Sequence, residues 1–499
     1  MHTALLLDMA ADAAPDRLAL GRRADGLTFA ETRRRARKAA AWLAGHGGQT
    51  VAFVGLNGPT LPVVLFASAL LAKPFAPLNY RLADVDLNRL VARTAPSVVV
   101  VDDDMASRLA PCPGVTVVSR SALEAAACEG GDGGEDYSAI DPDVGVLLFT
   151  SGTTGEPKAA ILRHRNLTSY VISTVEFLGA EDDEAALVSV PPYHIAGISA
   201  ILTSVYGGRR IVHLAAFTPE TWVDAAADEA ITHAMVVPTM LGRIMDVLEA
   251  RGESLPNLRA LSYGGGRMPL PVIERALALL PHVDFVNAYG LTETSSTIAV
   301  LGPDDHRMAM YDDDPDVRRR LGSVGRPLPA LELEIRGPRG EVLPPGQSGE
   351  IYVRGEQVSG EYTHKKVVQD DGWFATNDGG WMDAAGYLFV EGRLDDVIVR
   401  GGENISPGEI EDVLRQHPAV ADVAVLGLPD NEWGEKVAAV IVAEGEPPSA
   451  ADLAGWVKSQ LRSTKTPEVW EFRAALPYNE TGKLLRRQLR AEMASAAPA

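Results

Sequence analysis

Residues 147–160, LLFTSGTTGEPKAA, join an apolar strand pattern directly to a run of hydroxyls, glycines and a lysine. Such a loop can hold phosphate, because glycines let the backbone turn its N–H groups toward an anion while hydroxyls and an ammonium add donors. The candidate phosphate ligands are Thr150, Ser151, Gly152, Thr153, Thr154, Gly155 and Lys158. The order differs from the common phosphate loop of nucleoside triphosphatases, in which Gly-Lys-Ser/Thr follows at fixed spacing. Taken alone, the segment also fits a polar hairpin after a strand.

The length of the chain indicates two or more domains, because 499 residues exceed what one hydrophobic core usually organises. A formal net charge of -21 argues against a nucleic-acid-binding surface. The nearest basic cluster, residues 33–38, continues a helical pattern after Thr28 and Glu31. We interpret it as a solvated helix face.

The start of the sequence and its cysteines indicate a cytoplasmic protein without an integral membrane segment. Residues 1–10 are apolar but carry Asp8 and no basic leader, unlike a secretory signal. The longest apolar run, residues 61–72, is too short to span a bilayer and predicts a buried helix. Cys112 and Cys128 lie in a loop-like region rich in Gly and Asp, which fits a reducing compartment. The ten scattered histidines show no zinc-ligand spacing.

Short apolar runs alternate with longer helical patterns, which predicts an α/β fold with parallel sheets. We expect a large N-terminal domain over residues 1–393 whose last part, about 321–393, is a β-rich subdomain. The expected strands of this domain include residues 50–55, 97–101, 186–190, 331–335, 349–354 and 386–390.

Residues 394–499 predict a small α+β domain joined by a polar hinge near Asp395. The expected elements are strands at 420–426 and 436–442 and a helix at 450–461. An earlier helix should begin at Ser406 and Pro407, with Glu409 completing a capping box.

A second distinctive segment, residues 287–293, places an aromatic ring, a hydroxyl and a carboxylate around a glycine turn. Tyr289 has the ring to stack on a purine, and Glu293 has the carboxylate to hold a magnesium ion that bridges phosphates. The alternative is a surface turn with an N-capping threonine.

Two further motifs carry weaker signals. Asp378 can accept both hydroxyls of a ribose, and Arg393 can meet a ribose hydroxyl or a phosphate. Near the C-terminus, Gly482 frees the backbone and leaves Lys483 projecting. An aspartate in a turn is ordinarily a turn former, and a lone lysine is ordinarily solvated charge.

In this order and at these separations, the four motifs resemble the adenylate-forming superfamily of acyl-CoA synthetases, firefly-type luciferases and peptide-synthetase adenylation domains, and they look most like acyl-CoA or aryl-CoA ligases. The resemblance covers the chain from Thr28 to Lys483. It implies ATP, Mg²⁺ and coenzyme A as cofactor and co-substrates, a small-molecule carboxylic acid as partner, and a mobile small domain. It leaves the oligomeric state open.

The resemblance also implies roles for individual residues. Catalytic roles fall on Lys483, Glu293, Thr153 and Lys158, and the magnesium ligands would be Glu293 and Thr150. ATP or AMP contacts beyond the phosphate loop would come from Gly265, Gly266, Asn287, Ala288, Tyr289, Gly290, Thr292, Asp378, Arg393 and Lys483. The acyl-binding residues would be His194, Ile195, Gly197, Gly264 and Gly265. The thioester-step loop would be Gly401, Gly402 and Glu403, and the hinge Asp395.

The implied chemistry needs positive charge rather than a side-chain nucleophile. A carboxylate attacks the α-phosphorus of ATP, pyrophosphate leaves, and a thiol then attacks the acyl-AMP. Magnesium at Glu293 and the ammonium of Lys483 would neutralise charge at the reacting phosphate. This agrees with a sequence in which no Ser-His-Asp or Cys-His arrangement stands out.

Three positions depart from the family pattern. Ala159 replaces a usual glycine after Pro-Lys, Asn377 replaces the glycine before Asp378, and Thr464 replaces a usual tyrosine before lysine. Asn377 is expected to keep the turn, because asparagine tolerates positive φ.

The expected substrate is a fatty, cyclic or aryl acid. Residues 191–197 contain no carboxylate to pair with an α-ammonium, and small or apolar residues surround His194, which can also be a plain packing histidine. Arg267 could pair with a second carboxylate, but a basic residue is common there and carries little weight. The alternatives are an enzyme that loads a separate carrier protein and a catalytically silent ligand-binding relative.

Overall fold

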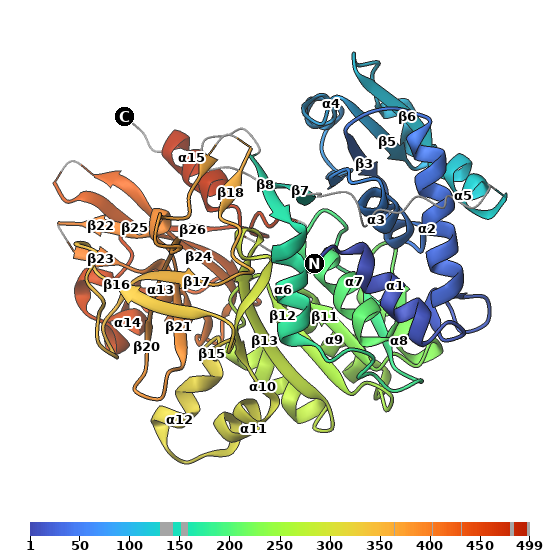
Figure 1. Cartoon of the computed structure of the whole chain (residues 1–499). Coiled ribbons are helices and arrows are strands. Elements are labelled where there is room, and N and C mark those ends of the chain that lie inside the picture. Colours follow the sequence, from blue (N-terminus) through green and yellow to red (C-terminus); the bar gives the residue numbers. More distant parts are fainter. Residues whose placement is uncertain are drawn as a thin grey trace.

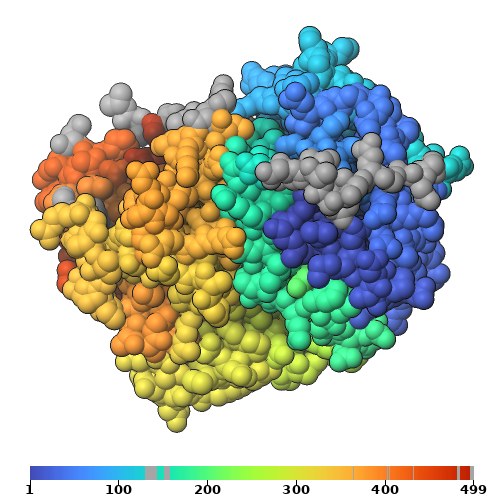
Figure 2. All heavy atoms as spheres, viewed as in Figure 1, coloured from blue at the N-terminus to red at the C-terminus, as the bar shows by residue number. Residues whose placement is uncertain are grey.

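The computed structural model describes residues 1–129, 143–150, 158–363, 365–401, 403–430, 432–479 and 484–496. It has a large mixed α/β body followed by a small α+β unit, as the sequence predicts (Figure 1). We call residues 1–393 the large domain and residues 394–496 the small domain. The space-filling view shows the small domain, in orange and red, packed against the rest of the chain (Figure 2).

Two mainly parallel sheets form the large domain. The first has the order β15-β14-β13-β12-β11-β9-β10-β1-β2. Its strands are β1 (Leu18–Leu20), β2 (Leu27–Thr28), β9 (Ala185–Val188), β10 (Arg210–His213), β11 (His233–Val236), β12 (Ala260–Gly264), β13 (Asp284–Leu291), β14 (Ser296–Leu301) and β15 (Arg326–Pro327).

The second sheet has the order β19-β18-β8-β7-β4-β3-β5-β6. Its strands are β3 (Thr50–Val54), β4 (Phe75–Pro77), β5 (Ser97–Val101), β6 (Val115–Ser119), β7 (Val144–Thr150), β8 (Lys158–Arg163), β18 (Glu361–Tyr362) and β19 (Lys365–Lys366). Strands β3 and β5 are buried along their whole length, which explains their unbroken runs of apolar residues.

Helices cover both sheets. They are α1 (Ala4–Ala13), α2 (Phe29–Ala44), α3 (Thr60–Leu70), α4 (Asp84–Arg93), α5 (Arg120–Glu129), α6 (His164–Thr174), α7 (Ile195–Gly207), α8 (Pro219–Asp228), α9 (Pro238–Arg251), α10 (Leu270–Leu279), α11 (Pro303–Tyr311) and α12 (Pro315–Arg319). Thr28 caps α2, because its hydroxyl accepts a hydrogen bond from Glu31 N at 3.1 Å. The predicted helix over the longest apolar run is α3, in which every residue is buried.

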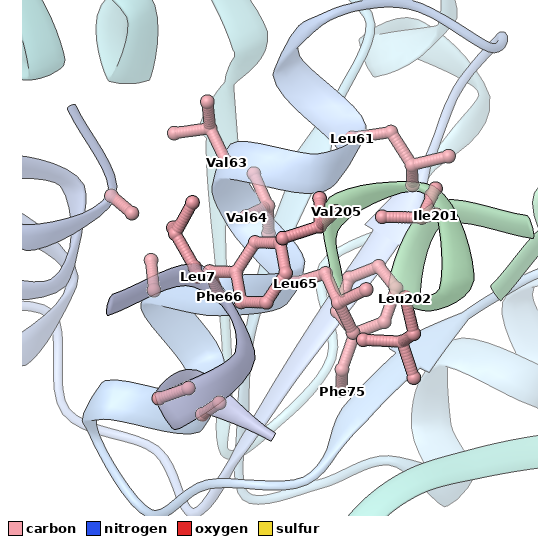
Figure 3. Packing of buried hydrophobic residues seen from close by; sticks show 14 of the residues in the cluster. Leu7, Leu61, Val63, Val64, Leu65, Phe66, Phe75, Ile201, Leu202 and Val205 are labelled. Atoms are coloured by element: carbon pink, nitrogen blue, oxygen red, sulfur yellow. The ribbon is translucent and has the colours of Figure 1, made fainter. Parts of the chain in front are cut away.

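The largest core lies between the two sheets. It combines Phe53 and Phe75 of the second sheet with Ile211 of the first, and the helices α3 and α7 pack between them. Figure 3 shows Phe66 of α3 beside Val205 of α7, and Phe75 of β4 beside Leu202 of α7. Because α7 is held from both sides, its first residues take a fixed place at the edge of both sheets. No helix within the described ranges is long and apolar enough to cross a membrane.

The β-rich subdomain forms a third sheet of order β16-β17-β20-β21, and the small domain forms a fourth of order β23-β22-β25-β24 with β26 beside β25. The strands are β16 (Glu332–Arg336), β17 (Gly349–Arg354), β20 (Phe374–Met382), β21 (Leu388–Arg393), β22 (Ile398–Arg400), β23 (Glu403–Ile405), β24 (Val420–Asp430), β25 (Gly434–Ala443) and β26 (Val469–Phe472). The small domain adds helices α13 (Pro407–Arg415), α14 (Ala450–Gln460) and α15 (Arg486–Ala496).

Two local predictions are wrong. Ser406 precedes α13 but does not cap it, because its hydroxyl donates to Glu391 O at 3.0 Å, and the carboxylate of Glu409 instead binds Lys465. Cys128 lies in α5 rather than in a loop, although it is exposed and unpaired as a free thiol. For Ser406, a hydrogen bond to the distant Glu391 carbonyl replaces the predicted helix cap. For Cys128, helix α5 extends through the segment that was predicted to be a loop.

Candidate active site

The candidate site lies where strands of both large-domain sheets end. A cavity of about 320 Å³ is lined by residues that follow β9, β10 and β11 of the first sheet and β3 and β4 of the second. Ligands of open α/β sheets bind outside the carboxyl ends of their strands, which is the position of this cavity. The small domain contributes Tyr478 and Asn479 to its wall. The cavity is therefore bounded by both domains.

The candidate phosphate loop joins β7 and β8, which pair in antiparallel register. Thr150 lies opposite Lys158, and the Thr150 hydroxyl is 3.4 Å from Lys158 O. The loop residues Ser151, Gly152, Thr153, Thr154 and Gly155 lie outside the described residues. Ala159, which departs from the family pattern, is buried without disturbing the register. At the described base of the hairpin, the Thr150 hydroxyl thus lies beside the backbone carbonyl of Lys158.

Glu293 lies in a short 3₁₀ turn, Thr292–Thr294, directly after β13. The hydroxyl of Tyr362, on the neighbouring strand β18, donates to the Glu293 carboxylate, and Ser359 N donates to Glu293 O at 2.8 Å. Burial and the adjacent Glu293 charge raise the pKa of Tyr362, so its hydroxyl stays protonated. Tyr362 also pairs with β8 opposite Ala160, which connects the carboxylate to the phosphate-loop hairpin. The sequence analysis missed Tyr362, because nothing near it in sequence signals the contact.

Tyr289, Asp378 and Arg393 form one hydrogen-bonded group. The Tyr289 hydroxyl donates to Asp378 Oδ2 at 2.6 Å, and Arg393 Nε lies 3.1 Å from Asp378 Oδ1. The pairing of β20 with β21 sets Asp378 opposite Arg393. Burial raises the pKa of the Tyr289 hydroxyl well above its usual value, and the negative charge of Asp378 adds to this. Residues from two separate motifs therefore meet at one point.

Asn377 keeps the turn before Asp378, as predicted. Its φ is +60°, in the left-handed region that asparagine tolerates, and its side-chain amide donates to Asp395 Oδ2 at 2.9 Å. Asp395 is the predicted hinge residue and lies in the 3₁₀ turn Leu394–Asp396. The ribose-contact candidate and the hinge candidate are thus linked by one side chain.

Close packing requires glycine at the last residue of β12 and within β13. A Cβ at Gly264 would lie 2.2 Å from Ala288 O, and one at Gly290 would lie 1.8 Å from Ser296 O. Gly265 has φ of +80°, and Gly266 follows it in the same loop. The amide of Asn287 donates to Ser323 O at 3.0 Å, so this side chain has a structural contact within the large domain.

The acyl-binding candidates lie at the first turn of α7. His194 precedes the helix, Ile195 begins it, and Gly197 approaches Pro191 O so closely that a Cβ would lie 3.1 Å away. Burial lowers the pKa of His194 to about 4. Farther along α7, the Ser199 hydroxyl lies 3.1 Å from that of Ser296, a contact that the sequence did not suggest.

The two candidate elements of the small domain lie in different places. Asn479 lines the cavity, and the residue that follows it in the motif, Lys483, lies outside the described residues. Gly401 turns between β22 and β23 with φ of +56° and donates its N–H to Trp433 O at 2.8 Å. Figure 1 shows this hairpin at the outer edge of the small domain, far from β7 and β8. Glu403 pairs with Arg400 in the hairpin, and Gly402 lies outside the described residues.

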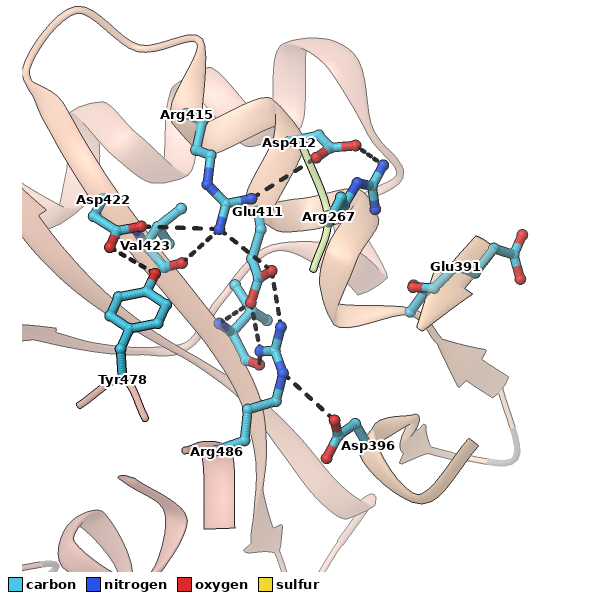
Figure 4. A network of polar contacts seen from close by, with 12 residues as sticks. Arg267, Glu391, Asp396, Glu411, Asp412, Arg415, Asp422, Val423, Tyr478 and Arg486 are labelled. Carbon is cyan, nitrogen blue, oxygen red and sulfur yellow. Dashed lines mark hydrogen bonds and ion pairs between the residues drawn. The ribbon is translucent and has the colours of Figure 1, made fainter. Parts of the chain in front are cut away.

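Arg267 faces the small domain rather than the acyl candidates. Its guanidinium donates to Asp412 on α13, so the interpretation that it binds a second substrate carboxylate has no support in this arrangement. Figure 4 shows this pair beside a second ion pair, between Glu411 and Arg486. Tyr478, next to Asn479, donates to Asp422 at 2.7 Å.

Known protein families match nearly the whole chain. The family model described as AMP-binding enzyme matches residues 7–363, and that of the AMP-binding enzyme C-terminal domain matches residues 409–483. A feruloyl-CoA synthase of an Amycolatopsis species is 35% identical over 474 residues, which cover 93% of each chain. A fatty acid–[acyl-carrier-protein] ligase of Streptomyces coeruleorubidus is 32% identical over 486 residues, which are 93% of this chain and 91% of the relative.

A solved structure has the same architecture. The o-succinylbenzoate CoA synthetase of Bacillus subtilis in complex with its acyl-adenylate intermediate superposes with a TM-score of 0.83 at 29% identity, over 97% of each chain. The same relative with ATP and a magnesium ion superposes with a TM-score of 0.82 at 29% identity, over 97% of this chain and 98% of that chain.

Proposed function

The chain belongs to the AMP-binding enzymes of the adenylate-forming superfamily, and we propose that it is an acyl- or aryl-CoA ligase that activates a monocarboxylic fatty, cyclic or aryl acid. The acid and ATP form acyl-AMP and pyrophosphate. Coenzyme A then attacks the acyl carbonyl and releases AMP.

One observation carries the proposal. The small domain places Asn479, the start of the motif that ends in Lys483, on the wall of a cavity at the strand ends of the large domain. Lys483 follows Asn479 by four residues in this motif. Tyr289, which donates to Asp378, lies near the carboxyl end of β13 in the first sheet. This arrangement suits the first half-reaction, in which an ammonium must approach the α-phosphate.

The residues present fit a magnesium ion that arrives with the nucleotide. Such an ion needs only one or two protein oxygens, because water and phosphate supply the others. Among the described residues no cluster of three or more His, Cys, Asp or Glu side chains gathers, whereas the Glu293 carboxylate is held in place by Tyr362. Glu293, with Thr150, would hold the ion, and the ion would supply charge neutralisation on the phosphates.

Each remaining residue has a proposed task in binding or orientation. Asp378 and Arg393 hold the ribose, with Tyr289 fixing the Asp378 carboxylate and offering its ring to the base. The loop from Thr150 to Lys158 grips the leaving phosphates through its N–H groups and hydroxyls. For the second half-reaction, rotation at Asp395 would withdraw Lys483 and bring the Gly401 turn toward the thiol.

The acyl site favours an acid without an α-amine. Residues 195–207 of α7 carry no carboxylate to pair with an ammonium, and His194 is neutral at physiological pH because burial lowers its pKa to about 4. By their names, the relatives reported above act on feruloyl, fatty acid and o-succinylbenzoate groups, which is consistent with an aryl or alkyl chain here.

The test is pyrophosphate release over a panel of acids, with and without coenzyme A, followed by detection of the thioester. The panel contains hydroxycinnamic, arylacetic and fatty acids, with amino acids as the negative set. Acid-dependent pyrophosphate and a CoA thioester support the proposal. Pyrophosphate without thioester, restored by a carrier protein, would identify a carrier-loading enzyme, and no acid-dependent pyrophosphate would indicate a silent relative.

A further inference from the structure

Arg267 connects the candidate site to the small domain. It directly follows Gly264, Gly265 and Gly266 at the end of β12, which are candidates for nucleotide and acyl contacts. Its guanidinium donates to the carboxylate of Asp412 on α13. The ion pair therefore joins the nucleotide-site loop directly to a helix of the other domain (Figure 4).

A glycine inside α13 supports the same contact. Glycine costs about 1 kcal/mol relative to alanine in a helix, so Gly408 calls for a reason. A Cβ there would lie 2.5 Å from Arg267 Nη1 and 3.0 Å from Glu391 O. Ser406, just before the helix, donates to the same Glu391 carbonyl at 3.0 Å. The first turn of α13 is thus shaped to dock against the large domain at Arg267.

On its other side α13 holds both flanks of the motif that contains Lys483. Glu411, next to Asp412, accepts from Arg486 Nη2 at 2.9 Å, and Arg486 Nε lies 3.6 Å from Asp396 at the hinge. Arg415 lies 3.9 Å from Asp422, which binds the hydroxyl of Tyr478. Tyr478 directly precedes the motif, and Arg486 follows it by three residues. The position of α13 therefore sets where Asn479 meets the cavity.

We infer that Arg267 is a positioning residue for acyl-AMP formation: its ion pair with Asp412 and its packing on Gly408 hold the small domain where Asn479 faces the cavity. This inference rests on the proposed function, because the pair must separate when the small domain turns for thioester formation. Arg267 touches neither substrate in this role. It biases the equilibrium between the two domain arrangements.

The pair is partly exposed, with side-chain exposures of 44% for Arg267 and 39% for Asp412, so its effect is that of a surface ion pair. Removing such a pair changes an equilibrium by about 1.4- to 5-fold. We expect Arg267→Gln to slow acyl-AMP formation relative to thioester formation from supplied acyl-AMP by this factor, with the KM for ATP within about twofold.

Two further variants separate positioning from folding. Gly408→Ala improves helix propensity but displaces the Arg267 guanidinium. We therefore expect the same shift in the ratio of the rate of acyl-AMP formation to the rate of thioester formation, without loss of stability. The charge swap Arg267→Asp with Asp412→Arg should restore the ratio. Arg275→Gln is the matched control, because Arg275 is 35% exposed and forms ion pairs with Asp246 and Glu249, both in the large domain.

The salt dependence of this rate ratio distinguishes a positioning role of Arg267 from a purely structural one. The wild-type ratio should drift toward that of Arg267→Gln as ionic strength rises, while the variant ratio stays constant. Equal change of both half-reactions in Arg267→Gln, or a neutral Gly408→Ala, would overturn the inference. If the wild type releases no pyrophosphate with any acid, the proposed function fails instead, so the two failures are distinguishable.

Discussion

Replacing Arg486 by methionine should strongly destabilise the small domain. The Glu411 side chain is only 3% exposed and its carboxylate accepts hydrogen bonds from Arg486 and from Val425 N at 2.8 Å. Arg486→Met would leave that buried charge without its hydrogen-bonded cation and with only the more distant Arg415, whose guanidinium lies 3.7 Å from the carboxylate. Breaking a buried ion pair in this way costs about 3–5 kcal/mol. We expect the free energy of unfolding of the small domain to fall by that amount at pH 7.

The cost depends on pH in a defined direction. Burial by itself raises the pKa of Glu411, but the charge and hydrogen bonds of Arg486 outweigh it and leave the net pKa below its ordinary value. The stabilisation by the Glu411–Arg486 pair is therefore present above the ordinary glutamate pKa of about 4.3, and it is lost as pH falls through the lowered pKa of Glu411. In Arg486→Met the unpaired carboxyl takes up a proton more readily, so the difference from wild type should shrink between pH 7 and pH 5.

Native-state hydrogen exchange of amides in β24 and β25 measures this quantity, because core strands exchange through unfolding of their own domain. Glu411→Gln combined with Arg486→Met keeps an acceptor for Val425 N without a charge and should recover most of the loss. Arg462→Met, at an exposed position, is the control. A loss below about 1 kcal/mol, or one that does not change with pH, would refute the reasoning.

Three other predictions concern the active site. Tyr362→Phe removes the donor that orients Glu293 and should raise the magnesium concentration for half-maximal pyrophosphate release about tenfold. The control Tyr311→Phe changes a residue that is 69% exposed and should leave this concentration unchanged. An unchanged magnesium dependence in Tyr362→Phe would exclude this role of Tyr362. His194→Phe should leave the pH profile of acyl-AMP formation unchanged between about pH 5.5 and 8, because burial already holds the pKa of His194 at about 4; a limb near pH 6.5 seen only in the wild type would contradict this. Arg243 lines the cavity, is exposed, and has its guanidinium carbon 5.6 Å from the centre of the Phe217 ring, so we expect it to bind a coenzyme A phosphate. Arg243→Gln should therefore raise the KM for coenzyme A up to about fivefold but leave the KM for pantetheine unchanged. Equal effects on both thiols would argue against a phosphate contact.

Patterns local in sequence predicted the elements well. Periodicity placed β5 at residues 97–101 and β17 at residues 349–354 with their observed bounds, because a strand or helix is selected by which of its own residues must be buried. The positive φ of Asn377 followed from the same kind of local argument. Ser406 shows the limit of such local arguments, since its hydroxyl donates to a carbonyl of β21 instead of capping the helix.

Contacts between distant segments were out of reach of such patterns. Tyr362 and Glu293 are 69 residues apart, and Arg267 and Asp412 are 145 apart, so only the packed sheets and domains bring them together. Asp378 and Arg393 were predicted as contacts of one ribose, and the register of β20 with β21 sets them opposite each other. Motifs therefore predicted which residues carry chemistry, whereas topology determined which neighbours contact and orient them.

The central claim is that a carboxylate oxygen attacks the α-phosphorus of ATP, and isotope transfer tests it most directly. An accepted acid labelled with ¹⁸O in its carboxylate is turned over with ATP and coenzyme A, and the phosphorus products are analysed by mass spectrometry. The account predicts one ¹⁸O atom in AMP and none in pyrophosphate. Label in inorganic phosphate, with ADP as the nucleotide product, would contradict it.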